Sequence, residues 1–241
     1  MLGSTSGDDS DISDYDMQDG ITSVYTVDEM LSEGLLLAGF SREKQRRQPK
    51  SNLQDFVDRY GSTPTVLCKI WIDLQVARTE EARVPPAKRV LKYYLMAHHF
   101  LKQYPTESER KAAYQLRTQT MREWVWFFVE KIRALKVDKI VWPASHIHGD
   151  DIWVCTIDGT MFASNEIAGE DKAKDPQMFS HKHHGAGFNA EVAVSVKESR
   201  CIWINGPGPA GKDVNLVLFC KPGGLREKLL EYGKKGIADG G

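Results

Sequence analysis

The sequence lacks several features by which a function class is recognised directly. No apolar run approaches the ~20 residues that a membrane span requires, so we expect no membrane partner. A Gly-rich phosphate-binding loop, a GxGxxG stretch after a strand and a Ser-His-Asp pattern are all missing. The cysteines form no Cys-x-x-Cys pair and are typical of reduced thiols in an intracellular protein: Cys68, Cys155, Cys201 and Cys220.

Basic residues are missing from one part of the chain. Residues 1–40 contain nine Asp or Glu and no Lys or Arg. Residues 41–241, the body of the chain, therefore contain all 32 bases and the 24 remaining acids, a net charge of +8, although the net charge of the whole chain is −1. An acidic tail on a basic body suits a nucleic-acid binder whose tail competes with the polyanion, but a solvated tail on a mildly basic domain has the same charges. In both cases residues 1–24 are predicted to be disordered, and no secretory signal is expected.

Residues 25–50 predict one short helix, from Thr26 to Leu37, followed by the basic segment REKQRRQPK. This segment, with Arg46 and Arg47 at its centre, has three interpretations: a nuclear-import signal, a DNA-backbone contact or a charged linker.

Residues 51–142 have the apolar periodicity of helices. Gly61-Ser62 predicts a turn before a helix that begins at Thr63-Pro64, and Thr106 with Glu109 forms a capping box. A helix, a tight turn and a second helix with exposed bases are compatible with a helix-turn-helix DNA reader, although a plain helical bundle gives the same pattern.

Residues 143–241 change to strand patterns. Strands are predicted at Ile152–Asp158, Phe188–Val196 and Cys201–Asn205, with a polar loop over 164–184 between the first two. A helix after Asp213 and a fourth strand over Lys235–Asp239 follow. Three consecutive strands, a helix and a fourth strand predict an α/β fold. This order is that of the first half of a ribonuclease-H-like domain, which follows the helical domain in the sequence.

Asp158 and Asp239 are the strongest candidates for chemistry. Each follows a short apolar run and precedes glycine, in VCTIDGT and GIADGG. Two such aspartates on neighbouring strands could hold a divalent cation, although a turn aspartate at a strand end is common. Asp213 is a weaker metal candidate, because an aspartate at a helix start usually acts as an N-cap.

The stretch FSHKHHGAGF (179–188) has three histidines and Lys182. Imidazoles can ligate zinc, but no Cys or acid pair accompanies them at ligand spacing, and His-rich loops are often only exposed. Lys182, at the edge of the second strand, is the better candidate for a contact with a DNA phosphate.

Four motifs in order resemble the DDE-type transposase-derived nucleases of the PIF/Harbinger class. They are IDGT (157–160), SHKHHGAGFNAEVAVSV (180–196), WINGPGPAGKD (203–213) and IADGG (237–241), and they cover about residues 140–241. In the helical part, YGSTPTVLCKIW (60–71) and LMAHHFLKQYPTESE (95–109) look like the N-terminal region of some members.

The resemblance implies a nuclear protein that cuts DNA strands and joins transposon ends. In this family two aspartates and one glutamate hold two Mg²⁺ or Mn²⁺ ions, one for the attacking oxygen and one for the leaving oxygen. Asp158 matches the first aspartate and Asp239 the second, with Asp213 as an alternative because it also lies in a family motif.

The sequence departs from the family pattern at the third acid. The family glutamate lies on a helix beyond the DGG motif, whereas the sequence ends at Gly241, so we expect a truncated protein with little cleavage of its own. Glu166, Glu170 or Glu191 could in principle substitute, but Glu191 is predicted to lie on the second strand and the other two in a loop, not on the expected helix. There are two competing interpretations. One is a non-catalytic, transposon-derived DNA-binding protein, and the other is a cytosolic helical scaffold. Homo-oligomers are a further expectation.

Overall fold

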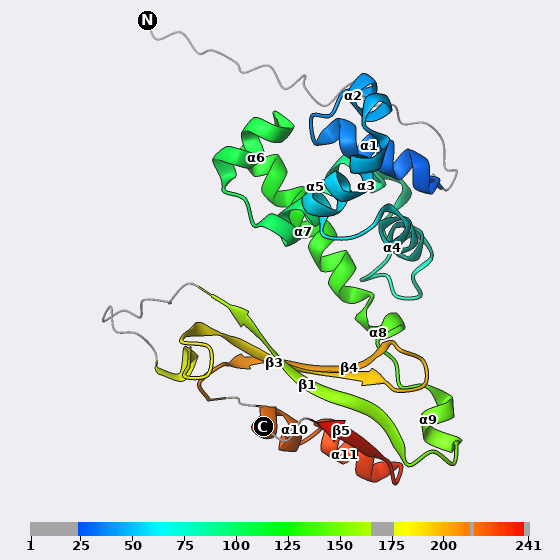
Figure 1. Cartoon of the computed structure of the whole chain (residues 1–241), viewed down its shortest axis with the longest axis vertical. Coiled ribbons are helices and arrows are strands. Elements are labelled where there is room, and N and C mark those ends of the chain that lie inside the picture. The colour runs from blue at the N-terminus through cyan, green and yellow to red at the C-terminus, as the bar shows by residue number, and fades with distance from the viewer. Residues whose placement is uncertain (1–23, 165–175, 213–214, 239–241) are drawn as a thin grey trace, which may run out of the picture. The chain divides into compact units, whose positions relative to one another are not determined.

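The computed structural model describes residues 24–164, 176–212 and 215–238. The chain divides into two compact units, and the boundary along the sequence lies between Leu135 and Lys136 (Figure 1). The first unit is helical and the second is built on a mixed five-stranded sheet, so the chain belongs to the α/β class that the sequence predicts. Within the described ranges, no helix combines the length and the apolar character needed to cross a membrane.

The helical unit consists of seven α-helices and one 3-10 turn within its described residues. Their bounds are α1 Val27–Leu37, α2 Arg42–Arg47, α3 Pro49–Tyr60, α4 Pro64–Val76, η1 Pro86–Lys88, α5 Leu91–Gln103, α6 Glu107–Tyr114 and α7 Thr118–Ala134.

The helix starts follow from capping residues. Thr26 and Thr106 each accept a hydrogen bond from the main-chain N–H three residues on, and Glu29 and Glu109 return one, so both helices begin with a complete capping box. Thr63 caps α4 in the same way, directly before Pro64, and Gly61 ends α3 in the left-handed conformation at φ 79°. These predicted helix starts are therefore confirmed.

The basic segment Arg42–Lys50 is not a linker, and that interpretation is wrong. Ser41 caps α2, and after Gln48 the chain enters α3 at Pro49. Gln45 is the buried residue of α2 and its side-chain amide donates to the carbonyls of Ser32 and Phe40, which fastens α2 to the end of α1. A buried anchor of this kind gives the segment a fixed place in the fold.

The core of the helical unit is aromatic. Trp71 of α4 lies against Tyr94 of α5, with ring centroids 5.1 Å apart, and against Phe128 of α7 at 6.3 Å. Tyr60 and Tyr94 are buried with their hydroxyls donating to the carbonyls of Gly34 and Leu67, at 2.7 and 2.8 Å. Each buried ring therefore packs on its neighbours without leaving its hydroxyl unpaired.

The second unit begins with two short helices and continues with the strands and two more helices. The bounds are α8 Lys136–Lys139, α9 Ala144–His148, β1 Trp153–Ala163, η2 Pro176–Met178, β2 Phe179–Ser180, β3 Gly185–Ser195, β4 Cys201–Pro209, α10 Asn215–Cys220, α11 Leu225–Glu231 and β5 Lys235–Ala238. The first predicted strand therefore runs five residues beyond Asp158, to Ala163.

The sheet has β3 and β1 at its centre. β1 pairs with β3 antiparallel and with β5 parallel, and β3 pairs antiparallel with β4 and with the short β2. The path from β4 through β3 and β1 to β5 therefore places three consecutive antiparallel strands beside a fourth, parallel strand, which is reached through α10 and α11.

The two faces of this sheet are covered differently. Ile157 of β1, Ala193 of β3 and Trp203 of β4 lie opposite one another in the register and pack with Leu225 and Leu229 of α11. The other face carries several exposed side chains, among them Phe162 at 57% and Val194 at 37%. We call the first the helix-covered face and the second the open face.

Candidate functional site

Asp158 lies in the middle of β1, on the open face of the sheet. Its cross-strand partner is Val192 and its side chain is exposed, and because β1 continues to Ala163 the predicted strand end at Asp158 is wrong. Side chains alternate between the faces of a strand, which puts Asp158 on the face that α10 and α11 leave uncovered. One carboxylate oxygen accepts a hydrogen bond from the N–H of Gly159 at 2.7 Å.

The strands of the two predicted metal ligands are neighbours in the sheet. β1 and β5 pair in parallel with Ile157 opposite Ala238, and Asp158 and Asp239 are the next residues in the sequence after these two. The prediction that the fourth strand lies beside the first is therefore confirmed. Asp239 itself lies outside the described residues, as do Asp213, Glu166 and Glu170.

The described residues provide one acid for a cation at this position. In the ranges that the structure covers, no group of three or more His, Cys, Asp or Glu side chains is arranged to hold a metal ion. Asp158 suits Mg²⁺ or Mn²⁺ in chemistry, because an exposed carboxylate presents the hard oxygen donors that these ions prefer. It supplies one protein ligand, and any partner acid has to come from outside the described ranges.

Glu191 cannot take the place of the third acid beside Asp158. It lies opposite Gly159 in the register, one position from the Asp158–Val192 pair, so its side chain is on the helix-covered face. The carboxyl is 1% exposed, with one oxygen accepting from Trp203 Nε1 at 3.1 Å and the other without a hydrogen-bond partner.

Burial shifts the pKa of Glu191, an effect that sequence reasoning missed. Desolvation raises the pKa of Glu191, and the hydrogen bond from Trp203 offsets part of that rise. Cys155, on the same face, has its pKa raised to about 11 by burial and by the negative charge of Glu191. The sequence does show a glutamate in the alternating stretch FNAEVAVSV, on the face opposite to the valines. That this face is the buried one is known only from the structure.

Lys182 lies in the turn between β2 and β3, beside a pocket in the second unit. The pocket is lined by ten residues, Gly159, Met161, Ser180, His181, Lys182, His183, Asn189, Ala210, Gly211 and Leu216. Two of the three histidines of the motif, together with Lys182, therefore lie at one opening. The structure does not support the zinc interpretation, because the described residues contain no group of three or more His, Cys, Asp or Glu that could hold a metal ion.

Arg46 and Arg47 lie on α2 in the helical unit, and both are exposed. Arg47 forms an ion pair with Glu43 one turn earlier, so its charge is partly matched on the same helix. They belong to a different unit from Asp158 and Lys182, and the predicted DNA contacts do not form one cluster within either unit.

The turn between α3 and α4 does not give α4 the surface of a DNA-reading helix. Its exposed side chains include the apolar Val66, Ile72 and Val76 and a single base, Lys69. A recognition helix needs donors and acceptors that reach base edges. The geometry of α4 therefore favours the plain helical bundle over the helix-turn-helix interpretation.

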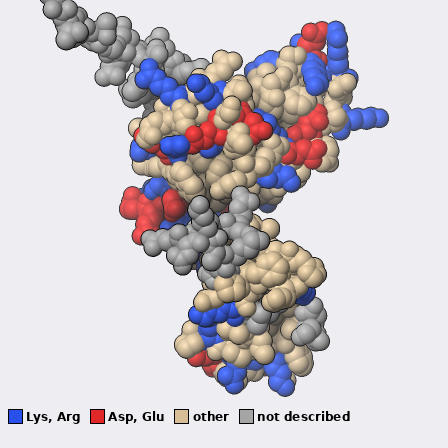
Figure 2. All heavy atoms as spheres, turned by 90° about the vertical axis from the view of Figure 1, so that its left-hand side faces the viewer, with Lys and Arg blue, Asp and Glu red and all other residues tan. Residues whose placement is uncertain are grey.

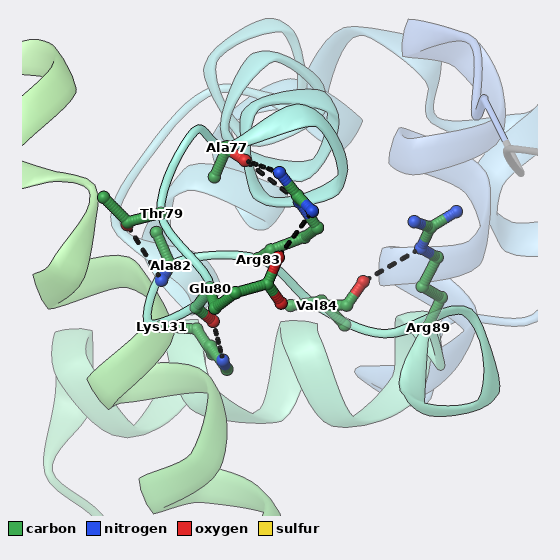
Figure 3. Close-up of polar contacts among 8 residues, drawn as sticks. All are labelled: Ala77, Thr79, Glu80, Ala82, Arg83, Val84, Arg89 and Lys131. Atoms are coloured by element: carbon green, nitrogen blue, oxygen red, sulfur yellow. Dashed lines mark hydrogen bonds and ion pairs between the residues drawn. The ribbon is translucent and has the colours of Figure 1, made fainter.

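Several bases of the helical unit serve the fold itself. In the segment between α4 and α5, Arg83 donates from Nε and Nη2 to the carbonyl of Ala77, at 3.0 and 2.8 Å, and pairs with Glu80 (Figure 3). Lys131 of α7 donates to the carbonyl of Glu80 at 2.9 Å, and Arg89 donates to that of Val84 at 3.1 Å. These contacts hold the segment between α4 and α5 in place. The basic side chains that make them are therefore less available to bind DNA.

The remaining charges of the helical unit are mixed. Residues 24–135 contain 19 Lys or Arg and 13 Asp or Glu, a net of +6. On the face shown in Figure 2, red side chains lie among the blue ones over this unit. Five arginines of the unit pair with glutamates, which lowers the charge available to a polyanion: Arg42, Arg47, Arg83, Arg122 and Arg133.

The comparisons with known proteins add no family to these observations. No protein-family model matches the chain, and neither a curated protein nor a solved structure does.

Proposed function

We propose that this protein is a transposase-derived, DDE endonuclease-like protein whose sheet unit is ribonuclease-H-like and whose substrate is DNA. The observation that carries the proposal is the strand order β4-β3-β1-β5, with β5 parallel to β1 and Asp158 on β1. In this arrangement a strand that is reached through two helices returns beside the first strand. Ile157 and Ala238 are paired in the register, and Asp158 and Asp239 are the residues that follow them in the sequence.

Asp158 has the properties that a metal ligand needs at such a place. Its carboxylate is exposed on the open face, and the short hydrogen bond from Gly159 N–H fixes its orientation. A bound Mg²⁺ or Mn²⁺ supplies charge stabilisation to the attacking and leaving oxygens of a phosphodiester. The role of Asp158 is to hold that cation beside the open face, where a DNA strand has access.

A second candidate function is that of a non-catalytic DNA-binding protein derived from the same class. The specific observation in its favour is that Asp158 is the one acid of its face among the described strand residues, while the helical unit has a net charge of +6. The helical unit would then bind DNA through its bases, and the exposed α2 would serve for backbone contact or nuclear import. A homo-oligomer is compatible with both candidate functions.

Metal binding tests the proposal directly. Mn²⁺ is titrated into the full chain and monitored by electron paramagnetic resonance, with Asp158→Ala as the variant and Asp150→Ala, an exposed acid of the preceding turn, as the matched control. We expect at least a tenfold loss of Mn²⁺ affinity in Asp158→Ala, because losing even an outer-shell partner typically costs that much. Equal affinity in the wild type and Asp158→Ala would remove the metal site.

Plasmid nicking then separates the two candidates. Nicking by the full chain with Mn²⁺ that disappears in Asp158→Ala and persists in Asp150→Ala supports the nuclease. No nicking and no Mn²⁺ binding that depends on Asp158, together with DNA binding whose log affinity falls linearly with log salt concentration, supports the non-catalytic binder. No DNA binding at low salt leaves the helical scaffold.

A further inference from the structure

The pocket beside Lys182 is a formed cavity whose lining residues do not include Asp158. Its volume is about 310 Å³, at the small end of the range for ligand sites. Strands β1 and β3 contribute Gly159, Met161 and Asn189, the β2–β3 turn contributes Ser180 to His183, and the segment after β4 contributes Ala210 and Gly211.

The wall of the pocket is held in place by main-chain contacts. Gly211 N–H donates to the carbonyl of Gln177 at 2.7 Å, and Asn189 Nδ2 donates to that of Ala210 at 3.2 Å. A Cβ on Gly211 would lie 2.6–2.9 Å from three carbonyl oxygens, so only glycine lets this segment approach so closely. The shape of the pocket is thus set by the backbone and does not depend on a ligand.

The side chains at the opening are donors and cations. Lys182, His181 and His183 are exposed at the rim, and the buried Ser180 accepts from the N–H of His183 at 3.3 Å while its own hydroxyl hydrogen can be donated inward. No acidic side chain is among the lining residues of the described ranges.

The pocket lies on a different face from Asp158. Gly159 and Met161 face the same side as Ile157, the helix-covered face, whereas Asp158 points to the open face. Its function therefore does not require the predicted cation.

The geometry points to a phosphate-binding pocket, in which Lys182 provides the charge and His181, His183 and Ser180 provide hydrogen-bond donors. An ammonium group with several neutral or cationic donors at a preformed opening is the arrangement that binds a tetrahedral oxyanion. The same phosphate chemistry could come from a free nucleotide or from the backbone of a nucleic acid. In the second case the pocket deepens the proposed function by adding a DNA contact remote from the cleavage site.

Two probes distinguish these sources. Inorganic phosphate and dTMP are titrated into the full chain by isothermal calorimetry, and a single-stranded oligonucleotide is titrated at several salt concentrations. For free phosphate or dTMP we expect Lys182→Ala to weaken binding about tenfold, the size of one charge-assisted hydrogen bond. For the oligonucleotide we expect the slope of log affinity against log salt to fall by about 1 in Lys182→Ala.

The control is Lys197→Ala, an exposed lysine just beyond the opposite end of β3. His181→Gln with His183→Gln removes the imidazoles at similar size, and thermal unfolding verifies that each variant is folded. Loss in Lys182→Ala and in the double variant, with Lys197→Ala unchanged, supports the pocket even if the metal site fails. Binding of neither probe by the wild type, or equal loss in Lys182→Ala and Lys197→Ala, overturns the proposal.

Discussion

The cores of the two units differ in size and in the side chains that fill them. The main core of the helical unit includes Trp71, Tyr94, Phe56, Tyr60 and Phe128, all nearly inaccessible to solvent. The core between the sheet and α11 contains six buried residues, none of them aromatic: Val154, Cys155, Ala193, Ile202, Leu225 and Leu229. An aromatic side chain buries about 150–250 Å², so the helical unit gains much more apolar burial for each core residue.

The residues proposed to bind ligands lie in the unit with the smaller core. Asp158, Lys182 and Glu191 all belong to the unit with the smaller core, and regions that bind ligands tend to come from the less stable part of a protein. Within that unit the same contrast exists between the two faces of the sheet. The helix-covered face buries a carboxyl group, whereas the open face exposes Phe162 and Val194 around Asp158.

The largest effect is expected from the aromatic core of the helical unit. Trp71→Ala should lower the free energy of unfolding by about 3–5 kcal/mol, because the cavity that remains cannot be filled by its rigid neighbours. Trp126→Ala is the matched control, since Trp126 is 51% exposed and contacts the ring of Phe100, and we expect a loss of about 1 kcal/mol. Urea unfolding measures both, and hydrogen exchange shows in which unit protection is lost. Equal effects of the two substitutions would contradict the comparison.

A smaller, pH-dependent effect is expected from Glu191. Its pKa is raised in the folded chain, so the folded state disfavours the ionised carboxyl. The free energy of unfolding should therefore decrease as the pH rises from the unfolded pKa, about 4.3, through the raised folded pKa. Glu191→Gln removes the charge, and we expect it to stabilise the sheet unit at neutral pH and to lose that advantage in acid.

Glu198→Gln sharpens this test because its pH dependence has the opposite sign. The hydrogen bond from Arg200 lowers the pKa of Glu198, so its contribution is present at neutral pH and is lost as the pH falls through the lowered pKa. Urea midpoints measured over a pH series should therefore diverge for the two variants. A Glu191→Gln curve parallel to that of the wild type would mean that the buried carboxyl does not titrate as described.

The smallest effect is expected from the helix cap of α6. Thr106→Ala should cost about 1 kcal/mol, because it removes the side-chain acceptor of Glu109 N–H. Thr106→Ser keeps that acceptor and should restore most of the loss. Hydrogen exchange of α6 is the sensitive measurement, and a change located in the sheet unit would contradict the separation of the two units.

Local signals predicted much of the secondary structure. The capping boxes at Thr26 and Thr106 and the Thr63-Pro64 start depend on residues within one turn, so they can be read from the sequence. The basic segment at Arg42 was misread because the anchor of α2, buried Gln45, gains its role only from Ser32 and Phe40. The true end of β1 was missed for a similar reason: pairing with β3 carries it through the polar Asp158 to Ala163.

By itself the sequence determined the α/β class, the order of strands and helices, and Asp158 and Lys182 as residues to examine, because periodicity and caps act over a few residues. Only the tertiary structure decided which face of the sheet the helices cover. Alternation in FNAEVAVSV would favour burying the valines, but α10 and α11 pack on the face of Ala193 and Glu191. Strand register and long-range packing decide which face is covered. As a result, Asp158 and the pocket beside Lys182 lie on opposite faces of β1.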